Sequence, residues 1–260
     1  MPAVATVEAL LHEVAEFAVV DLPLRIEPAA AAAVEQSLTD SGLLLLGEAH
    51  GARENPLVIR ALMRAFGLTR LALEWPEELA PVIHAFLASA TLADDWLLWL
   101  GDGRITAGHL AVLSELAATG QLDVLLYDGM LDAHRTWSQR DEAMAGRILA
   151  VAAPGTRTLV VAGNAHTPTA STELDVPLGA HLARHRPGIR EIRISYGGGT
   201  IYNCRPRHIP AGGGRAGRPG GLPLRLMSGQ EQVVLHAERG ELLLELPAPT
   251  EAVVPHRPCG

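Results

Sequence analysis

The chain contains Gly42-Leu-Leu-Leu-Leu-Gly-Glu-Ala-His-Gly51, four leucines that lead directly into a polar loop bounded by glycines. The short length of the apolar run and the glycines beside it predict a buried β-strand. The same arrangement, an apolar run followed by polar side chains, recurs three times along the chain. These runs and their polar ends are 71–73 with Glu74, 124–127 with Asp128, and 158–162 with Asn164 and His166.

Segments with helical periodicity separate these strands. Strands that alternate with helices imply right-handed βαβ units and a mostly parallel sheet. We therefore predict an α/β fold, a three-layer sandwich whose mostly parallel central sheet is flanked by helices, with an antiparallel extension near the C-terminus. The predicted helices are 56–66, 77–90, 107–118, 138–151 and 179–185, a fifth strand is 191–195, and the antiparallel strands are 233–236 and 242–246.

The whole chain, 1–260, is predicted to form a single domain. Hydrophobic residues make up 48% of the sequence, enough for one sizeable core. Residues 1–40 have the pattern of a mainly helical N-terminal decoration. The glycine-rich segment 211–221 is predicted to be a flexible loop, either a surface insertion or a lid. The oligomeric state is left open.

The composition of the chain argues against several classes of partner. The net charge of −8 argues against nucleic-acid binding, which draws on clustered basic residues. We find no apolar run near the roughly 20 residues that cross a bilayer, so we expect no membrane partner. The two cysteines, Cys204 and Cys259, do not predict a disulfide scaffold or a cysteine zinc site. The first residues have the pattern of an amphipathic helix and not of a signal peptide, so we expect a cytoplasmic location.

The polar residues at the strand ends form the candidate site. Ligands of open α/β sheets bind at the carboxyl ends of the strands, where these side chains would meet. The candidate catalytic residues are Glu48, His50, Glu74 and His166, and the candidate substrate-binding residues are Arg53, Asp128, Arg140 and Asn164.

Each of these residues also has a purely structural alternative. Glu48 is a possible helix cap, Asp128 before Gly129 is a typical turn, and Arg140 has Asp141 beside it for a surface salt bridge. The coincidence of four polar strand ends favours the functional interpretation. Other histidines on predicted helices are interpreted as surface or packing residues: His84, His109, His134 and His181.

Two chemistries are compatible with this set. In one, a carboxylate orients a histidine that takes a proton from water or from a substrate hydroxyl. In the other, His50, Glu74 and His166 bind a divalent metal that activates water. The sequence contains no HExxH, Walker, GxGxxG or GxSxG pattern, so zincin, P-loop, dinucleotide and serine-elbow interpretations lack support.

Four motifs lie at these strand ends and on the helix at 138–151: GEAHG at 47–51, ALEWP at 72–76, RDEAMAGRI at 140–148 and VVAGNAHT at 160–167. Together they resemble the erythromycin esterase/ChaN-like superfamily, which is related to the Tiki proteases. The paired GxxH motifs, at 47–50 and 163–166, bring the resemblance nearer to the ChaN-like branch. The resemblance covers about residues 42–203 and implies a parallel sheet between helices with the site at the strand ends.

The resemblance matches Glu48, His50, Glu74 and His166 to the functional positions of the hydrolytic members and Arg140 to a shared arginine. It implies three activities: an esterase that opens a lactone, a metal-dependent peptidase like the Tiki members, or a haem-binding protein like ChaN. The available iron ligands for haem are the histidines and Tyr127, Tyr196 and Tyr202.

Our leading hypothesis is a hydrolase that acts on an ester, lactone or amide of a small molecule, for example in secondary metabolism, and requires no cofactor. His50 is the expected base that activates water, oriented by Glu48 or Glu74. His166 is expected to stabilise the oxyanion or act as the acid, and Arg140 to hold a substrate oxygen. The alternatives are a metal-dependent hydrolase or peptidase, a biosynthetic cyclase or lyase, and a haem-binding protein.

Overall fold

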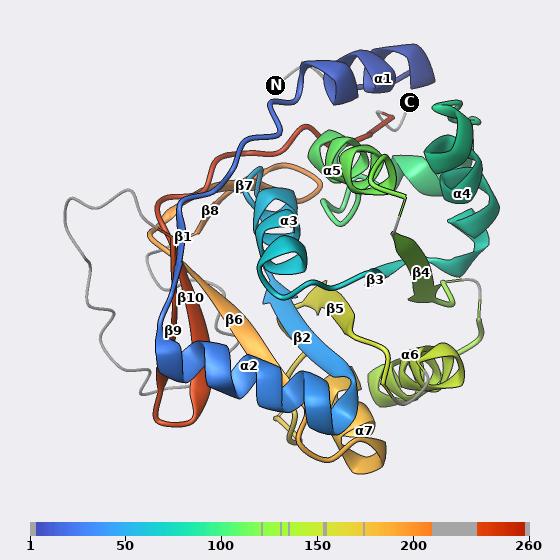
Figure 1. The fold of residues 1–260 in the computed structure, drawn as a ribbon. Coiled ribbons are helices and arrows are strands. Elements are labelled where there is room, and N and C mark those ends of the chain that lie inside the picture. The colour runs from blue at the N-terminus through green and yellow to red at the C-terminus, as the bar shows by residue number, and fades with distance from the viewer. Residues whose placement is uncertain are drawn as a thin grey trace.

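The computed structural model describes residues 4–120, 122–130, 132–134, 136–152, 155–173, 175–209 and 233–257. Within these residues, eight strands form one twisted sheet with helices on both faces (Figure 1). From one edge to the other the strands are β1 (Leu24–Ile26), β9 (Val233–Glu238), β10 (Glu241–Leu246), β6 (Arg190–Tyr196), β2 (Leu43–Glu48), β5 (Thr158–Gly163), β3 (Arg70–Pro76) and β4 (Asp123–Asp128).

The sheet is mostly parallel, as predicted. The six strands from β10 to β4 all pair in parallel with their neighbours. β9 runs antiparallel to β10, which confirms the predicted C-terminal extension. Because β2, β5, β3 and β4 are parallel neighbours, their carboxyl ends lie along one edge of the sheet.

The helices form two outer layers. One layer contains α2 (Pro28–Ser41), α3 (Asn55–Ala65) and α5 (Ala107–Ala117), and the other contains α6 (Trp137–Val151) and α7 (Leu178–His185). β2 is buried on both faces, so Leu44 and Leu46 pack in the core under the first layer, while Leu43 and Leu45 pack under α6 and α7. Two further helices are α1 (Val7–Glu16), which lies against α5, and α4 (Ala80–Ser89).

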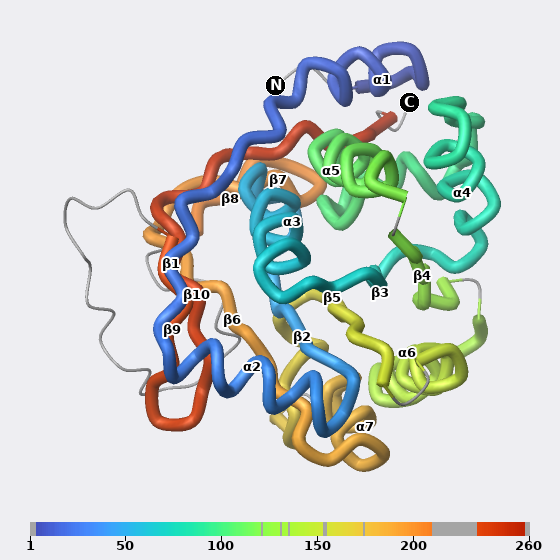
Figure 2. Tube along the Cα trace, in the orientation of Figure 1, coloured from blue at the N-terminus to red at the C-terminus, as the bar shows by residue number. Residues whose placement is uncertain are grey.

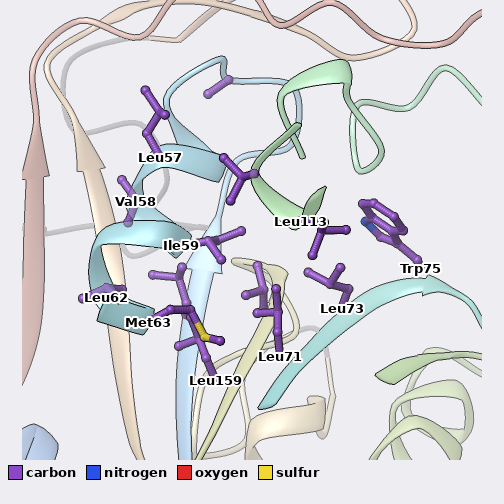
Figure 3. Close-up of a cluster of buried hydrophobic side chains, with 14 of the residues drawn as sticks. Leu57, Val58, Ile59, Leu62, Met63, Leu71, Leu73, Trp75, Leu113 and Leu159 are labelled. Carbon is purple, nitrogen blue, oxygen red and sulfur yellow. The ribbon is translucent and has the colours of Figure 1, made fainter. Parts of the chain in front are cut away.

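The main core lies between α3 and the sheet. Helical spacing places Val58, Ile59, Leu62 and Met63 on one face of α3. These side chains meet Leu71, Leu73 and Leu159 from β3 and β5, as Figure 3 shows. Aliphatic residues supply most of this packing because aromatic residues make up only 4% of the chain.

The N-terminal segment is more than the helical decoration predicted for residues 1–40. Its helices are present as α1 and α2, but Leu24–Ile26 forms the edge strand β1, which pairs with β9. α2 packs on the sheet through Ala30, Val34 and Leu38. A three-residue strand is too short to show a period of two, so the sequence pattern did not reveal it.

Two more segments close the structure near the candidate site. A hairpin of β7 (Gly199–Tyr202) and β8 (Pro206–Ile209) follows β6 and was not predicted. The C-terminal segment runs beside the N-terminus, where Val4 and Pro255 form a bridge (Figure 2).

The glycine-rich segment 211–221, predicted as a loop or lid, lies outside the described residues. Among the helices that are described, none has the length and apolarity to cross a membrane.

Candidate active site

The predicted convergence of strand ends is present in the structure. Glu48 ends β2, Glu74 lies near the end of β3, Asp128 ends β4, and His166 follows β5 by three residues. Glu48, Glu74, Asp128 and His166 are all buried. The sheet therefore gathers four ionisable groups at one edge, beneath the partly exposed His50 and Arg140.

Glu74 is the centre of this cluster. Its Oε2 accepts a hydrogen bond of 2.7 Å from the backbone N–H of Gly163 and lies 3.6 Å from Nε2 of His50. Its Oε1 accepts from Arg140 at 3.1 Å and lies 3.4 Å from Nε2 of His166. The carboxylate therefore lies within 3.6 Å of both imidazoles.

The environment of Glu74 keeps it ionised. Burial alone would raise the pKa of this carboxyl, but the positive charges of His166 when it is protonated, of His50 and of Arg104 outweigh burial and hold the pKa well below its usual value. A carboxylate with such a low pKa is a poor acceptor of a catalytic proton at neutral pH. Glu74 is therefore better suited to holding the two histidines than to acting as the base.

His50 is tied to two carboxylates. Its Nδ1 lies 3.1 Å from Oε1 of Glu48, and its Nε2 faces Glu74. Burial disfavours the charged imidazole, but the hydrogen bonds and charges of Glu48 and Glu74 outweigh burial and raise the pKa of His50 to about 10. His50 therefore carries a proton at neutral pH, which makes it a hydrogen-bond donor at both nitrogens.

His166 has a different partner. Its Nδ1 lies 2.8 and 3.0 Å from the two carboxylate oxygens of Asp141, and its ring packs against Trp137 with centroids 4.5 Å apart. Asp141 is fully buried and also accepts a hydrogen bond of 2.7 Å from the backbone N–H of Leu178. Nδ1–H therefore donates to Asp141, and Nε2 points toward Glu74 and Arg140.

Two arginines share one buried carboxylate at the edge of the cluster. Asp128 accepts hydrogen bonds from Nε and Nη2 of Arg140 at 3.0 and 2.7 Å, and from Nη1 of Arg104 at 2.7 Å. Arg104 also lies 3.7 Å from Glu74. Burial lowers the pKa of each guanidinium, but the surrounding carboxylates outweigh burial and raise it, so both remain cations.

The glycines of the two GxxH motifs allow this close packing. A Cβ at Gly163 would lie 3.0 Å from Nε2 of His50 and 3.5 Å from Glu74, so a side chain there would push against the cluster. A Cβ at Gly47 would lie 2.5 Å from Oγ1 of Thr167. In both motifs, glycine therefore leaves room for side chains that follow the neighbouring strand, His50 after β2 and Thr167 after β5.

Six of the eight predicted site residues come together: Glu48, His50, Glu74, Asp128, Arg140 and His166. Asn164 adjoins the cluster, since its backbone N–H donates to the carbonyl of Glu48 at 2.9 Å. Arg53, which was predicted to line the site, contacts a different part of the chain. Its side chain is exposed and its guanidinium lies over the Phe17 ring, 5.4 Å from the centroid. In a loop, side-chain direction depends on tertiary packing.

The site also contains Asp141 and Arg104, which the sequence interpretation missed. Asp141 immediately follows the predicted Arg140 on α6, and only the position of His166 reveals its role. Arg104 lies in an irregular loop with no periodicity. The remaining histidines take structural places, for example His109, which is buried and packs edge-on against Trp75. His84 lies 3.1 Å from the Val124 carbonyl, His181 is buried beside Ser138, and His134 precedes α6 in a loop.

The donor set suits a metal ion poorly. Glu74, the central candidate ligand, is paired with Arg140, and a divalent cation beside it would lie next to the guanidinium groups of Arg104 and Arg140. In the part of the chain that the structure describes, no group of three or more His, Cys, Asp or Glu residues is arranged to hold a metal.

Two of the three tyrosines considered for haem are engaged elsewhere. The Tyr127 hydroxyl donates to the Val161 carbonyl at 2.7 Å. The Tyr196 hydroxyl donates to Asn55 at 2.8 Å. Both tyrosines are buried in hydrophobic clusters, so neither offers its oxygen to an iron atom without breaking an internal hydrogen bond.

Comparison with known proteins shows the fold alone. No family model and no curated protein matches the sequence. A protein of Bacillus cereus known from a crystal structure is similar in fold, with a TM-score of 0.62 at 12% identity over 87% of this chain and 92% of that one.

Two further matches are too distant to support an argument. A structure described as bacterial protein toxins gives a TM-score of 0.42 at 20% identity, over 71% of this chain and 38% of that one. The type III effector HopBA1 gives 0.39 at 16% identity, over 72% and 92%.

Proposed function

We propose that this chain is a hydrolase that uses its histidine–carboxylate cluster to direct water against an ester, lactone or amide carbonyl of a small molecule. We also propose that it belongs to the erythromycin esterase/ChaN-like superfamily that its motifs resemble. One observation carries the proposal. The Nε2 atoms of His50 and His166 both lie within 3.6 Å of Glu74, and the Nδ1 atom of each contacts a further buried carboxylate.

The two histidines are suited to opposite roles. Asp141 holds His166 in the tautomer that leaves Nε2 as the lone-pair nitrogen, so His166 is the better general base. His50 lies between Glu48 and Glu74 and carries a proton, so it is the better acid and oxyanion partner. This assignment reverses the roles expected from the sequence.

In the proposed reaction, His166 accepts a proton from water and His50 gives a proton to the leaving group. A water proton passes to Nε2 of His166 while the water oxygen bonds to the carbonyl carbon. The oxyanion that forms receives hydrogen bonds from the His50 imidazolium and from Arg140. The intermediate then collapses, the bond to the leaving group breaks, and the leaving oxygen or nitrogen takes the proton of His50. Transfer of the water-derived proton from His166 to His50 restores the starting state.

The test uses p-nitrophenyl esters, lactones of several ring sizes and anilides with wild type, His166→Gln and His50→Gln. Loss of a general acid or base should lower kcat by roughly 10²–10⁴-fold in each variant. His185→Gln, at an exposed position on α7, is the control and should keep full activity. Wild-type turnover in both site variants would refute the proposal, as would an intact wild type that cleaves none of the panel.

Two measurements separate the alternatives. Mass spectrometry of the product should show the gain of one water, whereas cyclisation or elimination would show none. Dialysis against a chelator should leave turnover unchanged. Loss of turnover that Zn²⁺ restores would favour the metal-dependent alternative and would contradict the cofactor-free mechanism.

A further inference from the structure

A closed ring of three hydrogen bonds lies beneath the loop between Glu48 and His50. The backbone N–H of Ala49 donates to the hydroxyl oxygen of Tyr196 at 3.0 Å. The Tyr196 hydroxyl donates to Oδ1 of Asn55 at 2.8 Å. Nδ2 of Asn55 donates to the carbonyl of Ala49 at 2.8 Å. The donors and acceptors are unambiguous, because a carbonyl accepts only and a backbone N–H donates only.

The ring holds the peptide groups on both sides of one residue. The N–H of Ala49 belongs to the peptide bond after Glu48, and its C=O belongs to the peptide bond before His50. Both groups are held by side chains that are almost fully buried, since Asn55 is 0% exposed and Tyr196 is 1% exposed. The relative orientation of Glu48 and His50 is therefore set through the backbone.

The fold brings the two side chains to this place from distant segments. β2 pairs with β6 only as far as Gly47 and Arg193. β6 continues to Tyr196 through its pairing with β10, so the tyrosine lies beyond the end of β2. Asn55 is the first residue of α3. The side chains thus replace backbone partners that β2 loses when it ends.

We propose that Tyr196 and Asn55 are positioning residues: they hold the side chains of Glu48 and His50 in a fixed position relative to Glu74. The inference rests on the proposed hydrolysis for its effect on rate, but its effect on the loop is measurable without any substrate. The contact that depends on this loop is the one between Nδ1 of His50 and Oε1 of Glu48, which are 3.1 Å apart. A loop that moves by about 1 Å can cost roughly 100-fold in rate.

The first readout is amide hydrogen exchange at Ala49, measured by NMR in the 260-residue chain. Tyr196→Phe removes the acceptor of this N–H, so exchange should be at least about tenfold faster than in wild type. Tyr127→Phe is the matched control, because it removes an equally buried hydroxyl whose partner is Val161. This control should leave exchange at Ala49 at the wild-type rate.

The second readout is the split between kcat and KM on the best substrate of the panel. Tyr196→Phe should lower kcat about 10- to 100-fold with KM nearly unchanged, since the hydroxyl lies beneath the loop and not on the substrate side. Asn55→Asp tests the same ring independently. Its carboxylate cannot donate to the Ala49 carbonyl, so it should give the same loss.

The outcomes separate the two proposals. Faster exchange at Ala49 in Tyr196→Phe alone supports the positioning role, even if the panel shows no hydrolysis and the proposed function fails. If exchange at Ala49 became equally fast in Tyr196→Phe and Tyr127→Phe, a general loss of stability would explain the effect, and the inference would be overturned. Wild-type exchange at Ala49 together with wild-type kcat in Tyr196→Phe and Asn55→Asp would overturn it as well.

Discussion

Raising the pH from 7 to 9 should destabilise the wild-type protein, and His50→Gln should remove this dependence. Glu48 and Glu74 raise the pKa of His50 to about 10, against 6.5 for an unperturbed histidine. Between these two values the folded protein keeps a proton that the unfolded chain has lost. The stabilisation is therefore fully present below pH 6.5 and disappears as the pH rises toward 10.

The magnitude follows from the same two values. Each pH unit inside the window costs about 1.4 kcal/mol of unfolding free energy, which amounts to about 3 kcal/mol between pH 7 and 9. Three other groups with shifted pKa values, Glu74, Tyr196 and His109, act outside this window. Glu74 has a depressed pKa and loses its stabilising effect in acid, while Tyr196 has a raised pKa and loses stability only above pH 10. His109 has a lowered pKa and matters only below 6.5.

The assay is urea unfolding at pH 7, 8 and 9, paired with an NMR titration of the His50 ring. Wild type and the control His185→Gln should lose stability in parallel, while His50→Gln should give a flat line. A His50 ring that titrates near 6.5 would refute the reasoning, because it would show that the two carboxylates do not hold the proton. An equal pH slope in wild type and His50→Gln would refute it equally.

Three further predictions concern the scaffold. Asp128→Asn leaves Arg104 and Arg140 without their shared carboxylate and should cost about 3–5 kcal/mol in urea unfolding, whereas a loss below 1 kcal/mol would contradict the buried pairing. Gly51→Ala should prevent folding or lower Tm far more than the control Gly67→Ala. Both glycines have a positive φ, but only at Gly51 would the new Cβ meet a carbonyl oxygen, that of Tyr202 at 1.7 Å. Leu62→Ala in the core should cost about 2–5 kcal/mol, and the exposed Val151→Ala under about 0.5 kcal/mol; similar losses would place the core elsewhere.

The central strands could be predicted because their pattern is local. β2 and β5 are buried on both faces, so they appear in the sequence as continuous apolar runs that end at polar residues. β1 could not be predicted, because three half-buried residues become a strand only through their pairing with β9. The β7–β8 hairpin could not be predicted for the same reason, since its strands of four residues are partly exposed and pair with each other and with Gly51 and Pro249.

The site residues also fall into two groups, those that a local sequence pattern marks and those that only tertiary packing brings to the site. Glu48, Glu74 and Asp128 could be inferred from sequence, because a residue directly after a buried parallel strand lies at the ligand-binding edge whatever the rest of the chain does. Arg53 follows the same motif, yet its direction depends on Phe17, which packs against the loop from elsewhere in the sequence. Arg104 lies in a loop without periodicity, so no local pattern marked it.

The amino-acid order alone thus determines the central strands and the polar side chains at their ends, because burial and backbone propensity act over a few neighbouring residues. Only the tertiary structure decides what those side chains do. The raised pKa of His50 depends on Glu48 and Glu74, and the orientation of the His166 ring depends on Asp141, so these three carboxylates act from three different elements. Electrostatic interactions act through space, so the proposed assignment of acid and base rests on the folded arrangement and not on the motifs.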